Sequence, residues 1–252
     1  MRSQKTLVDE AVRIVGTAKA KGVILRLIGA VAVIIHSPEF SFLHEKLGRE
    51  LTDIDFISYG KQRQEIVNFL LDIGYQCDRR IISSLIPTAH YVFQKGPEIH
   101  LDIFFDRLEM CHTIDFMDQL EVDYPTISLA NLLLEKMQIV QLNEKDAIDT
   151  VVLLREHDVG KVDDQTINLE YISRLLSKDW GFYYTVTTNL KRIRDEFLPS
   201  YDLSGEDKTD VEHKIDTLLE RVEKKPKSLR WKMRARIGAK KKWYRDVEEL
   251  YR

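Results

Sequence analysis

Two aspartates separated by one residue are the feature of this sequence with the clearest potential for chemistry. They lie in the run Leu51-Thr52-Asp53-Ile54-Asp55-Phe56-Ile57. Residues i and i+2 of a β-strand point to the same face, so Asp53 and Asp55 would project together. Two carboxylates this close repel each other, and hard ions such as Mg²⁺ bind carboxylates together with phosphate oxygens. The pair predicts a metal site. The alternative is a half-exposed strand with solvated acids at its end.

A third acid lies in an apolar run further along the chain, Ile99-His100-Leu101-Asp102-Ile103-Phe104-Phe105-Asp106. Alternation places Asp102 and Asp106 on the same face of the predicted strand. Burying an unpaired aspartate is costly, and Asp102 is explained if this strand lies beside the first one and completes the metal site. Asp106 is the fallback third ligand, although its position at the strand end also suits a turn residue.

A Gly29-Ala30 pair separates the apolar run 23–28 from a short helical run that ends at His36. Small residues at a strand–helix junction let backbone N–H groups approach a phosphate, which the helix N-terminus also favours. The alternative is an ordinary tight turn. For His36 we expect a satisfied, partly buried histidine rather than a ligand.

The elements that would position these residues are strands and helices in alternation. We expect helices over residues 5–20 and 62–73, strands over 23–28, 53–58, 75–81, 90–94 and 99–105, and weaker strands over 113–116 and 120–123. The run Lys95-Gly96-Pro97 predicts a hairpin turn. A strand–helix–strand opening followed by a meander predicts a mixed sheet with flanking helices.

From Ser128 onward the apolar spacing becomes helical. We expect helices over residues 128–141, 145–157, 169–176, 182–197 and 206–224, and a basic helical stretch from Ser228. The predicted fold class is therefore an α+β or α/β domain over residues 1–127, followed by a mostly helical domain over residues 128–252.

Composition bounds the class of protein. The chain has 252 residues, is 44% hydrophobic and carries a net charge of −3, as ordinary globular proteins do. Its longest apolar run is far below the ~20 residues that cross a bilayer. The early charges of Lys5, Asp9 and Glu10 do not suit a signal peptide. Cys77 and Cys111 have no metal-ligand spacing, so we expect reduced thiols, a cytoplasmic location and no membrane partner.

The charge is unevenly placed. Residues 224–245, here named the basic tail, carry eleven Lys and Arg residues and no acid, which leaves about −14 on the rest of the chain. Such a tail could contact phosphates while Trp231, Trp243 and Tyr244 stack on unpaired bases, so tRNA or another nucleic acid is a candidate partner. The alternative, which we favour, is a solvated amphipathic helix whose Trp231, Met233 and Ile237 pack on the domain.

Three motifs together resemble the polymerase-β-like nucleotidyltransferase superfamily: Gly29-Ala30, Asp53-Ile54-Asp55 and Leu101-Asp102-Ile103, in that order. The context from Arg49 through Thr52 to the paired acids is most similar to the abortive-infection toxin branch. The lysine in Leu134-Glu135-Lys136-Met137 and the run Lys145-Asp146-Ala147-Ile148-Asp149 are also similar to that branch. The match covers roughly residues 20 to 155. Ala30 stands where many relatives have Ser, which leaves only backbone contacts in the phosphate loop.

The resemblance implies Mg²⁺- or Mn²⁺-dependent transfer of a nucleoside monophosphate from an NTP, such as ATP, to an unidentified acceptor, either a small molecule or a tRNA. It implies Asp53, Asp55 and Asp102 as catalytic metal ligands. It also implies nucleotide contacts from Gly29, Ala30, Thr52, Arg49 and Lys136. Arg49 also suits a positioning or surface role, and Lys136 a solvated helix lysine.

The resemblance to the abortive-infection toxin branch implies a toxin–antitoxin-like role. Two other classes stay open, a catalytically silent nucleotidyltransferase-like binding module and an RNA-binding adaptor that uses the basic tail.

Overall fold

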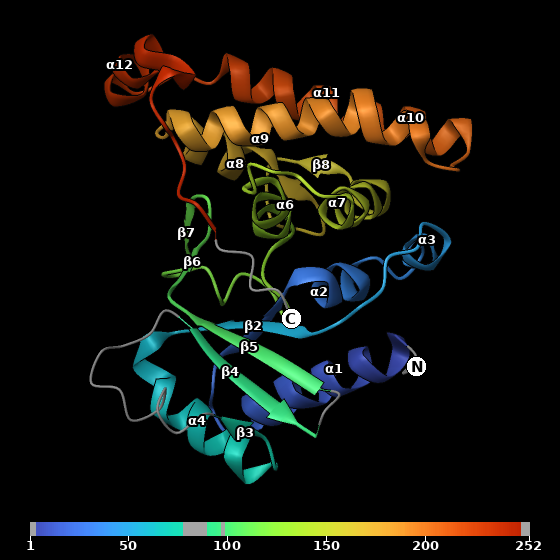
Figure 1. The fold of residues 1–252 in the computed structure, drawn as a ribbon, viewed down its shortest axis with the longest axis vertical. Helices are drawn as coiled ribbons and strands as arrows, with labels where there is room; N and C mark the ends of the chain where they lie inside the picture. Colours follow the sequence, from blue (N-terminus) through green and yellow to red (C-terminus); the bar gives the residue numbers. More distant parts are fainter. Residues whose placement is uncertain (1–3, 78–89, 97–98, 248–252) are drawn as a thin grey trace. The chain divides into compact units, whose positions relative to one another are not determined.

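The computed structural model describes residues 4–77, 90–96 and 99–247. The chain forms two compact units, both drawn in Figure 1. The first unit combines Met1–His36, Glu50–Glu109 and Ile114–Ser128. The second combines Ser37–Arg49, Met110–Thr113 and Leu129–Arg252. Two short segments from the first half of the chain therefore belong to the second unit.

A mixed sheet forms the centre of the first unit. Its strands lie in the order β1 (Leu25–Ile28), β2 (Ile54–Ser58), β5 (Ile99–Phe105), β4 (His90–Lys95) and β3 (Gln76–Cys77). β2 and β5 pair in parallel, and the other neighbours on this path pair antiparallel. Two short strands, β6 (Arg107–Glu109) and β7 (Thr113–Asp115), extend from β5. The predicted mixed sheet is confirmed.

Helices of the first unit bury most of their apolar residues, although Val12 of the first helix is 45% exposed. α1 (Gln4–Ala20) packs against β1 through an apolar face, and α2 (Gly29–His36) packs against β1 and β2. The short η1 (Gly60–Gln62) leads into α4 (Arg63–Asp72), which contacts β3. In Figure 1, α1 and α4 lie on the same side of the sheet. The buried face of α1 comprises Leu7, Ala11, Ile14, Val15 and Ala18.

The weak strand predicted over residues 120–123 is wrong, because this segment forms turns. The Asp123 carboxylate accepts the Tyr124 N–H at 2.6 Å, and the Asp123 carbonyl accepts the Arg26 Nε–H at 2.7 Å. An aspartate that bonds the next backbone amide favours a turn over a sheet ladder. Residues 125–127 then run along the free edge of β1 through the backbone groups of Leu27.

The second unit is mostly helical, as predicted. The side chains of Asn143, Asn168, Asp179, Ser204 and Ser228 each accept a backbone N–H at a helix start. A small parallel pair, β8 (Val159–Gly160) with β9 (Ile167–Asn168), accompanies the helices. Its helices are α3 (Phe42–Lys46), α6 (Leu129–Met137), α7 (Glu144–Glu156), α8 (Leu169–Leu176), α9 (Trp180–Arg192), a π-helical turn η2 (Ile193–Phe197), α10 (Leu198–Ser200), α11 (Gly205–Lys224), α12 (Leu229–Ile237) and η3 (Gly238–Lys240).

Several element bounds differ from the predicted ones. α6 ends at Met137 rather than at residue 141, because the Asn189 side-chain amide donates to the carbonyls of Met137 and Ile139 at 3.0 and 2.7 Å. The strand predicted over 75–81 is seen as β3, and residues 78–81 lie outside the described residues. Pro97 of the predicted hairpin turn also lies outside them. No helix among the described residues is long and apolar enough to cross a membrane.

Candidate metal centre

The parallel pairing of β2 with β5 brings two of the three predicted acids side by side. Asp55 and Asp102 are register partners across these strands. Neighbouring strands lie ~4.8 Å apart, and register partners in a parallel pair point to the same face. The prediction that the Asp102 strand lies beside the paired aspartates is confirmed. Asp102 is only 7% exposed, so it is the most buried of the three acids.

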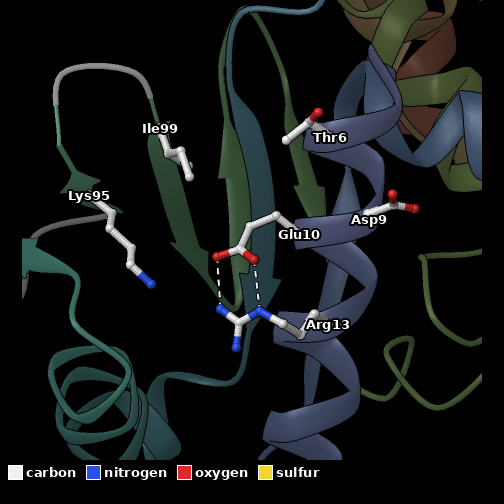
Figure 2. A pocket seen from close by; sticks show the side chains of 6 residues that line it. All are labelled: Thr6, Asp9, Glu10, Arg13, Lys95 and Ile99. Carbon is white, nitrogen blue, oxygen red and sulfur yellow. Dashed lines mark hydrogen bonds and ion pairs between the residues drawn. The ribbon is translucent and has the colours of Figure 1, made fainter. Parts of the chain in front are cut away.

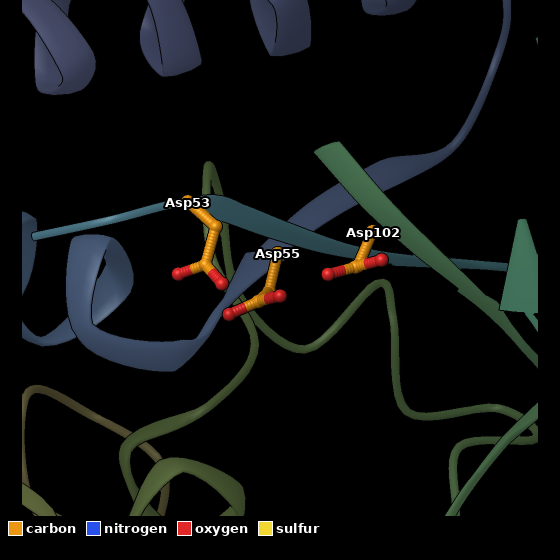
Figure 3. A group of neighbouring side chains, drawn as sticks. All are labelled: Asp53, Asp55 and Asp102. Atoms are coloured by element: carbon orange, nitrogen blue, oxygen red, sulfur yellow. The ribbon is translucent and has the colours of Figure 1, made fainter. Parts of the chain in front are cut away.

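Asp53, two residues before Asp55, completes the group at the start of β2. One carboxylate oxygen from each of Asp53, Asp55 and Asp102 lies within 4.8 Å of the other two. Figure 3 shows the three side chains directed to the same side of the strands. Asp53 and Asp55 are half-buried. Three carboxylates at this separation, one of them buried, repel strongly and form an oxygen donor set that suits Mg²⁺ or Mn²⁺.

The close contact between Gly29 and Asp55 requires a glycine at this position. The β1 residue before it, Ile28, is the register partner of Asp55 on the other side of β2. Gly29 has a φ of +72°, and a Cβ placed on it would lie 2.5 Å from Asp55 Oδ2. Glycine is therefore needed here both for the backbone conformation and for space. The same residue opens α2, whose first amides have no partner within the helix.

The nucleotide contacts predicted for Thr52 and Ala30 stay predictions, and the two residues have different surroundings. The Thr52 hydroxyl donates to Asp53 Oδ1 at 3.0 Å and so orients that carboxylate. The Thr52 side chain is exposed. Ala30 is buried as the second residue of α2 and has no polar side-chain atom. A contact from Ala30 to a phosphate would have to come from its backbone.

His90 is a neighbour of the three acids that the sequence reasoning missed. Its Nε2 lies 3.5 Å from Asp102 Oδ1, and its ring stacks on Phe104 with centroids 5.1 Å apart. The predicted hairpin of residues 90–105 could have indicated this contact, had its register been known. β4 pairs with β5 so that His90 faces Phe104, and Val92 faces Asp102. Diagonal neighbours in an antiparallel pair are within reach of aromatic side chains.

Asp106, the fallback ligand, does not join the three acids. Its carboxylate accepts the Gly60 N–H at 2.8 Å, and its φ is +60°. A positive φ and a carboxylate bonded to a backbone amide are typical of a turn residue. His36 is partly buried and satisfied, as expected, by the Thr126 hydroxyl and by Asp123 Oδ2 at 3.3 Å.

Arg49 and Lys136 meet in the second unit, at Asp149. Arg49 Nε lies 3.0 Å and Lys136 Nζ 3.0 Å from the Asp149 carboxylate, and His44 Nε2 lies 3.1 Å from it. Asp149 is fully buried. Burial opposes the charged form of Lys136, but the charges of Asp149 and Asp146 outweigh it and hold the lysine pKa above its usual range. Both residues therefore have carboxylate partners, and their contact with a nucleotide stays a prediction.

Burial also opposes the charged form of Asp149 itself. The charge of Lys136, the hydrogen bond from His44 and the charge of Arg49 outweigh that effect and hold the pKa of Asp149 well below its usual range. The result is an ionised carboxylate surrounded by cations in the protein interior. Such a group links the elements that supply its partners, here α3, α6 and α7.

A separate hollow in the first unit lies beside α1. It has a volume of about 460 Å³ and is lined by six side chains, four of them charged (Figure 2). Glu10 takes two hydrogen bonds from Arg13 at 2.7 Å and one from the Tyr75 hydroxyl at 2.6 Å. The Arg13 hydrogen bonds lower the pKa of Glu10 to about 2. Because Glu10 and Arg13 pair with each other and Lys95 donates to the Ile73 carbonyl, we assign no ligand to this hollow.

Trp231 and Trp243 of the basic tail pack on α9, and Tyr244 packs on Trp243. The Trp243 ring meets Trp180 and Tyr184, and Trp231 meets Tyr183, all edge-on. After them the Arg245 backbone N–H donates to Cys111 O at 3.0 Å, and its guanidinium donates to the carbonyls of Met110 and His112. Trp231 thus packs on the domain as we favoured. Met233 and Ile237, for which the same was expected, are 54% and 47% exposed, so that part of the prediction is wrong.

Comparisons with known proteins add a distant likeness in shape. No protein-family model and no curated protein matches the chain. Among solved structures, it is similar to the antibiotic-resistance factor ANT(2'')-Ia, with 13% identity over 69% of this chain and 96% of that one and a TM-score of 0.42. The lincosamide antibiotic adenylyltransferase LnuA, solved with lincomycin, gives 19% identity over 57% and 94%, with a TM-score of 0.40.

An antigenic nucleotidyltransferase-like protein from Paracoccidioides brasiliensis gives 11% identity over 90% of this chain and 96% of that one, with a TM-score of 0.38. Identities and TM-scores this low assign no function. The function proposed below is therefore built on the side chains of this chain.

Proposed function

We propose that this chain is a metal-dependent nucleotidyltransferase of the polymerase-β-like type. It would transfer a nucleoside monophosphate from an NTP to an acceptor hydroxyl on a small molecule or a tRNA. The observation that carries the proposal is the convergence of Asp53, Asp55 and Asp102 within 4.8 Å, beside the glycine that opens α2. A carboxylate group next to the start of a helix is suited to a metal-bound triphosphate.

The three acids have distinct places in this proposal. Asp53 and Asp55 would hold Mg²⁺ or Mn²⁺ together with phosphate oxygens, and Asp102 would face the acceptor. When bound, the metal would neutralise phosphate charge and lower the pKa of the acceptor hydroxyl. That hydroxyl would give up its proton to solvent, and its oxygen would bond to the α-phosphorus while the bond to the leaving pyrophosphate breaks. The Thr52 hydroxyl, bonded to Asp53, keeps the outermost carboxylate oriented.

The triphosphate would lie against the start of α2. The amides of Gly29 and Ala30 are the donors assigned to it, because a helix start favours anions. Ala30 adds no hydroxyl, so phosphate binding there depends on the backbone alone. Arg49 and Lys136 are further candidates for contacting the nucleotide. Because both residues bind Asp149, substituting either one would also disturb that ion pair, so their contribution is tested separately from that of the acids.

Two measurements test the proposal. The first is titration of the protein with Mn²⁺ alone, followed by electron paramagnetic resonance. The second is transfer of label from α-labelled NTPs to candidate small molecules and to tRNA. We expect Asp55→Asn and Asp102→Asn to weaken Mn²⁺ binding and to lower label transfer at least about 100-fold.

Asp106→Asn is the matched control for these variants. Asp106 lies on the strand face predicted for Asp102 but takes part in a turn with Gly60, and asparagine tolerates its positive φ. Its Mn²⁺ affinity and label transfer should equal those of the unchanged protein. Mn²⁺ binding that needs the three acids, without transfer to any acceptor, would favour the silent binding module. Mn²⁺ binding unaffected by either substitution would contradict the metal centre itself.

A further inference from the structure

One side of α12 is anchored and the opposite side is exposed. On the anchored side, the Trp231 ring lies 5.1 Å from that of Tyr183, and the Arg234 guanidinium lies 4.6 Å from the Trp180 ring centre. Figure 1 shows α12 beyond the end of α11. The Ser228 hydroxyl caps the first turn by accepting the Trp231 N–H. The helix is therefore held in one orientation about its own axis.

The exposed side of α12 carries an apolar stripe. Leu229, Met233 and Ile237 are 73%, 54% and 47% exposed. Residues four apart lie on the same helix face, and these three point away from the side held by Trp231 and Arg234. A single exposed leucine would need no explanation, but three large apolar side chains aligned on the exposed side of one short helix do.

Exposed basic residues flank the stripe on both sides. At about 100° per residue, Lys232 and Arg236 lie on one side of it and Arg230 on the other. Three further exposed lysines follow, Lys240, Lys241 and Lys242, of which Lys242 pairs with Asp246. No acidic residue occurs from Lys224 to Arg245. We call the set Leu229, Arg230, Lys232, Met233, Arg236 and Ile237 the α12 face.

We propose that the α12 face docks on an anionic lipid surface. The interfacial region of an anionic bilayer offers negative headgroups directly above an apolar layer, which matches bases that flank an apolar stripe. A nucleic acid would match the basic residues only, because its phosphates offer no apolar contact to Leu229 or Met233. Trp231 and Trp243, two of the three aromatic residues that could stack on nucleobases, already pack on α9.

The charge distribution supports the same occupant. The rest of the chain carries about −14, so an anionic surface repels it and attracts the basic tail. The two signals that stable peripheral attachment needs, an apolar contact and a basic patch, are both present on one short helix. This contact lies at the surface and is independent of the proposed transfer reaction. It departs from our expectation that the chain has no membrane partner.

Flotation of the full chain with vesicles tests this proposal. One set of vesicles is phosphatidylcholine alone, and in the other about a third of the lipid is phosphatidylglycerol. We expect binding to the anionic vesicles only, and release as the salt concentration rises. The combined variant Leu229→Ser, Met233→Ser and Ile237→Ser should bind at least about tenfold more weakly, with an unchanged circular dichroism spectrum.

Met117→Ser is the control for the loss of an exposed apolar side chain. Met117 is 54% exposed, as Met233 is, but lies in the first unit, so its variant should bind vesicles like the unchanged protein. Absence of binding to anionic vesicles at low salt would overturn the proposal. So would vesicle binding that survives the triple serine change, or tail-dependent binding to tRNA with none to vesicles. Asp55→Asn should leave vesicle binding unaltered, which separates this test from that of the metal centre.

Discussion

At the scale of single residues, the candidate centre depends on an absent side chain as much as on three acids. Gly29 lets the Asp55 carboxylate lie against the start of α2, where any Cβ would collide with it. Asp55 is in turn fixed by its register with Asp102. The position of one carboxylate is thus set by a turn conformation and a strand pairing together.

Substituting Gly29 should therefore damage the centre more than the fold. Gly29→Ala has to move Asp55 or the start of α2, and misplacement by about 1 Å at a reacting centre lowers rates roughly 100-fold. We expect weaker Mn²⁺ binding and label transfer reduced by that order. Both assays are those described for the aspartate variants.

Gly22→Ala is the matched control for this change. Gly22 has a φ of +75°, close to that of Gly29, but nothing lies within 4 Å of a Cβ placed there. An alanine there meets the strain of a left-handed backbone, about 1–2 kcal/mol, without touching an acid. Equal losses of Mn²⁺ binding in the two variants would show that strain, rather than contact with Asp55, causes the effect.

At the scale of secondary-structure elements, local sequence patterns predicted where each strand lies better than they predicted the contacts that strands and helices make with one another. Alternation located β2, β4 and β5 to within a residue, and the convergence of Asp53, Asp55 and Asp102 followed from assuming that β2 lies beside β5. His90 was missed because its contact needs the hairpin register. The end of α6 was missed because Asn189, about fifty residues later, supplies the hydrogen bonds that stop it.

The sequence also did not predict which apolar residues of a surface helix are buried. Helical periodicity finds the apolar residues of a helix but not which of them meet a partner. In α12 it marked Trp231, Met233 and Ile237 alike, and only Trp231 packs on α9. The roles of Arg49 and Lys136 are a similar case, because their shared partner Asp149 is identified by tertiary contact alone.

The buried carboxylate that links α3, α6 and α7 should be essential for stability. Asp149→Ala would leave Arg49, Lys136 and His44 without their common partner in the interior. Breaking a buried ion pair from one side costs about 3–5 kcal/mol. We expect a loss of that size in the free energy of unfolding, measured with urea.

An ion pair with an exposed carboxylate provides the comparison for Asp149. Asp158 lies 3.5 Å from Lys214, and its side chain is 85% exposed. Asp158→Ala should cost at most about 1 kcal/mol, because solvent screens the exposed Asp158 carboxylate and the buried Lys214 keeps its bonds to Asp210 and to the Leu154 carbonyl. If the free energy of unfolding fell by the same small amount in both variants, the cations around Asp149 would have to be paired with other groups.

At the scale of the whole molecule, stability should fall in mild acid because of one buried histidine. His112 is 7% exposed, stacks on Phe182, and shares the Thr185 hydroxyl with the Trp243 indole at 2.8 and 3.0 Å. Burial lowers the pKa of His112 from 6.5 to about 4, although the charge of Asp179 acts against this shift. Between these two pH values the unfolded chain takes up a proton that the folded chain does not.

The sign of the effect follows from that difference in proton uptake. The unfolded state binds more protons, so stability falls as pH drops through this window, by about 2 kcal/mol between pH 7 and pH 5. His112→Gln keeps a hydrogen-bonding side chain and should remove that part of the slope. Urea unfolding of both proteins at the two pH values measures it, and identical slopes would contradict the role given to His112.

The contact of Arg245 with residues 110–112 also bears on the order in which the protein is made. The ribosome releases Met110 to Thr113 long before Arg245 exists, so this loop of more than a hundred residues closes last. Every strand of the carboxylate-bearing sheet, by contrast, has been synthesised by residue 115. On a nascent chain we therefore expect the sheet to form first and the helical unit to be completed only after Arg245 has been synthesised.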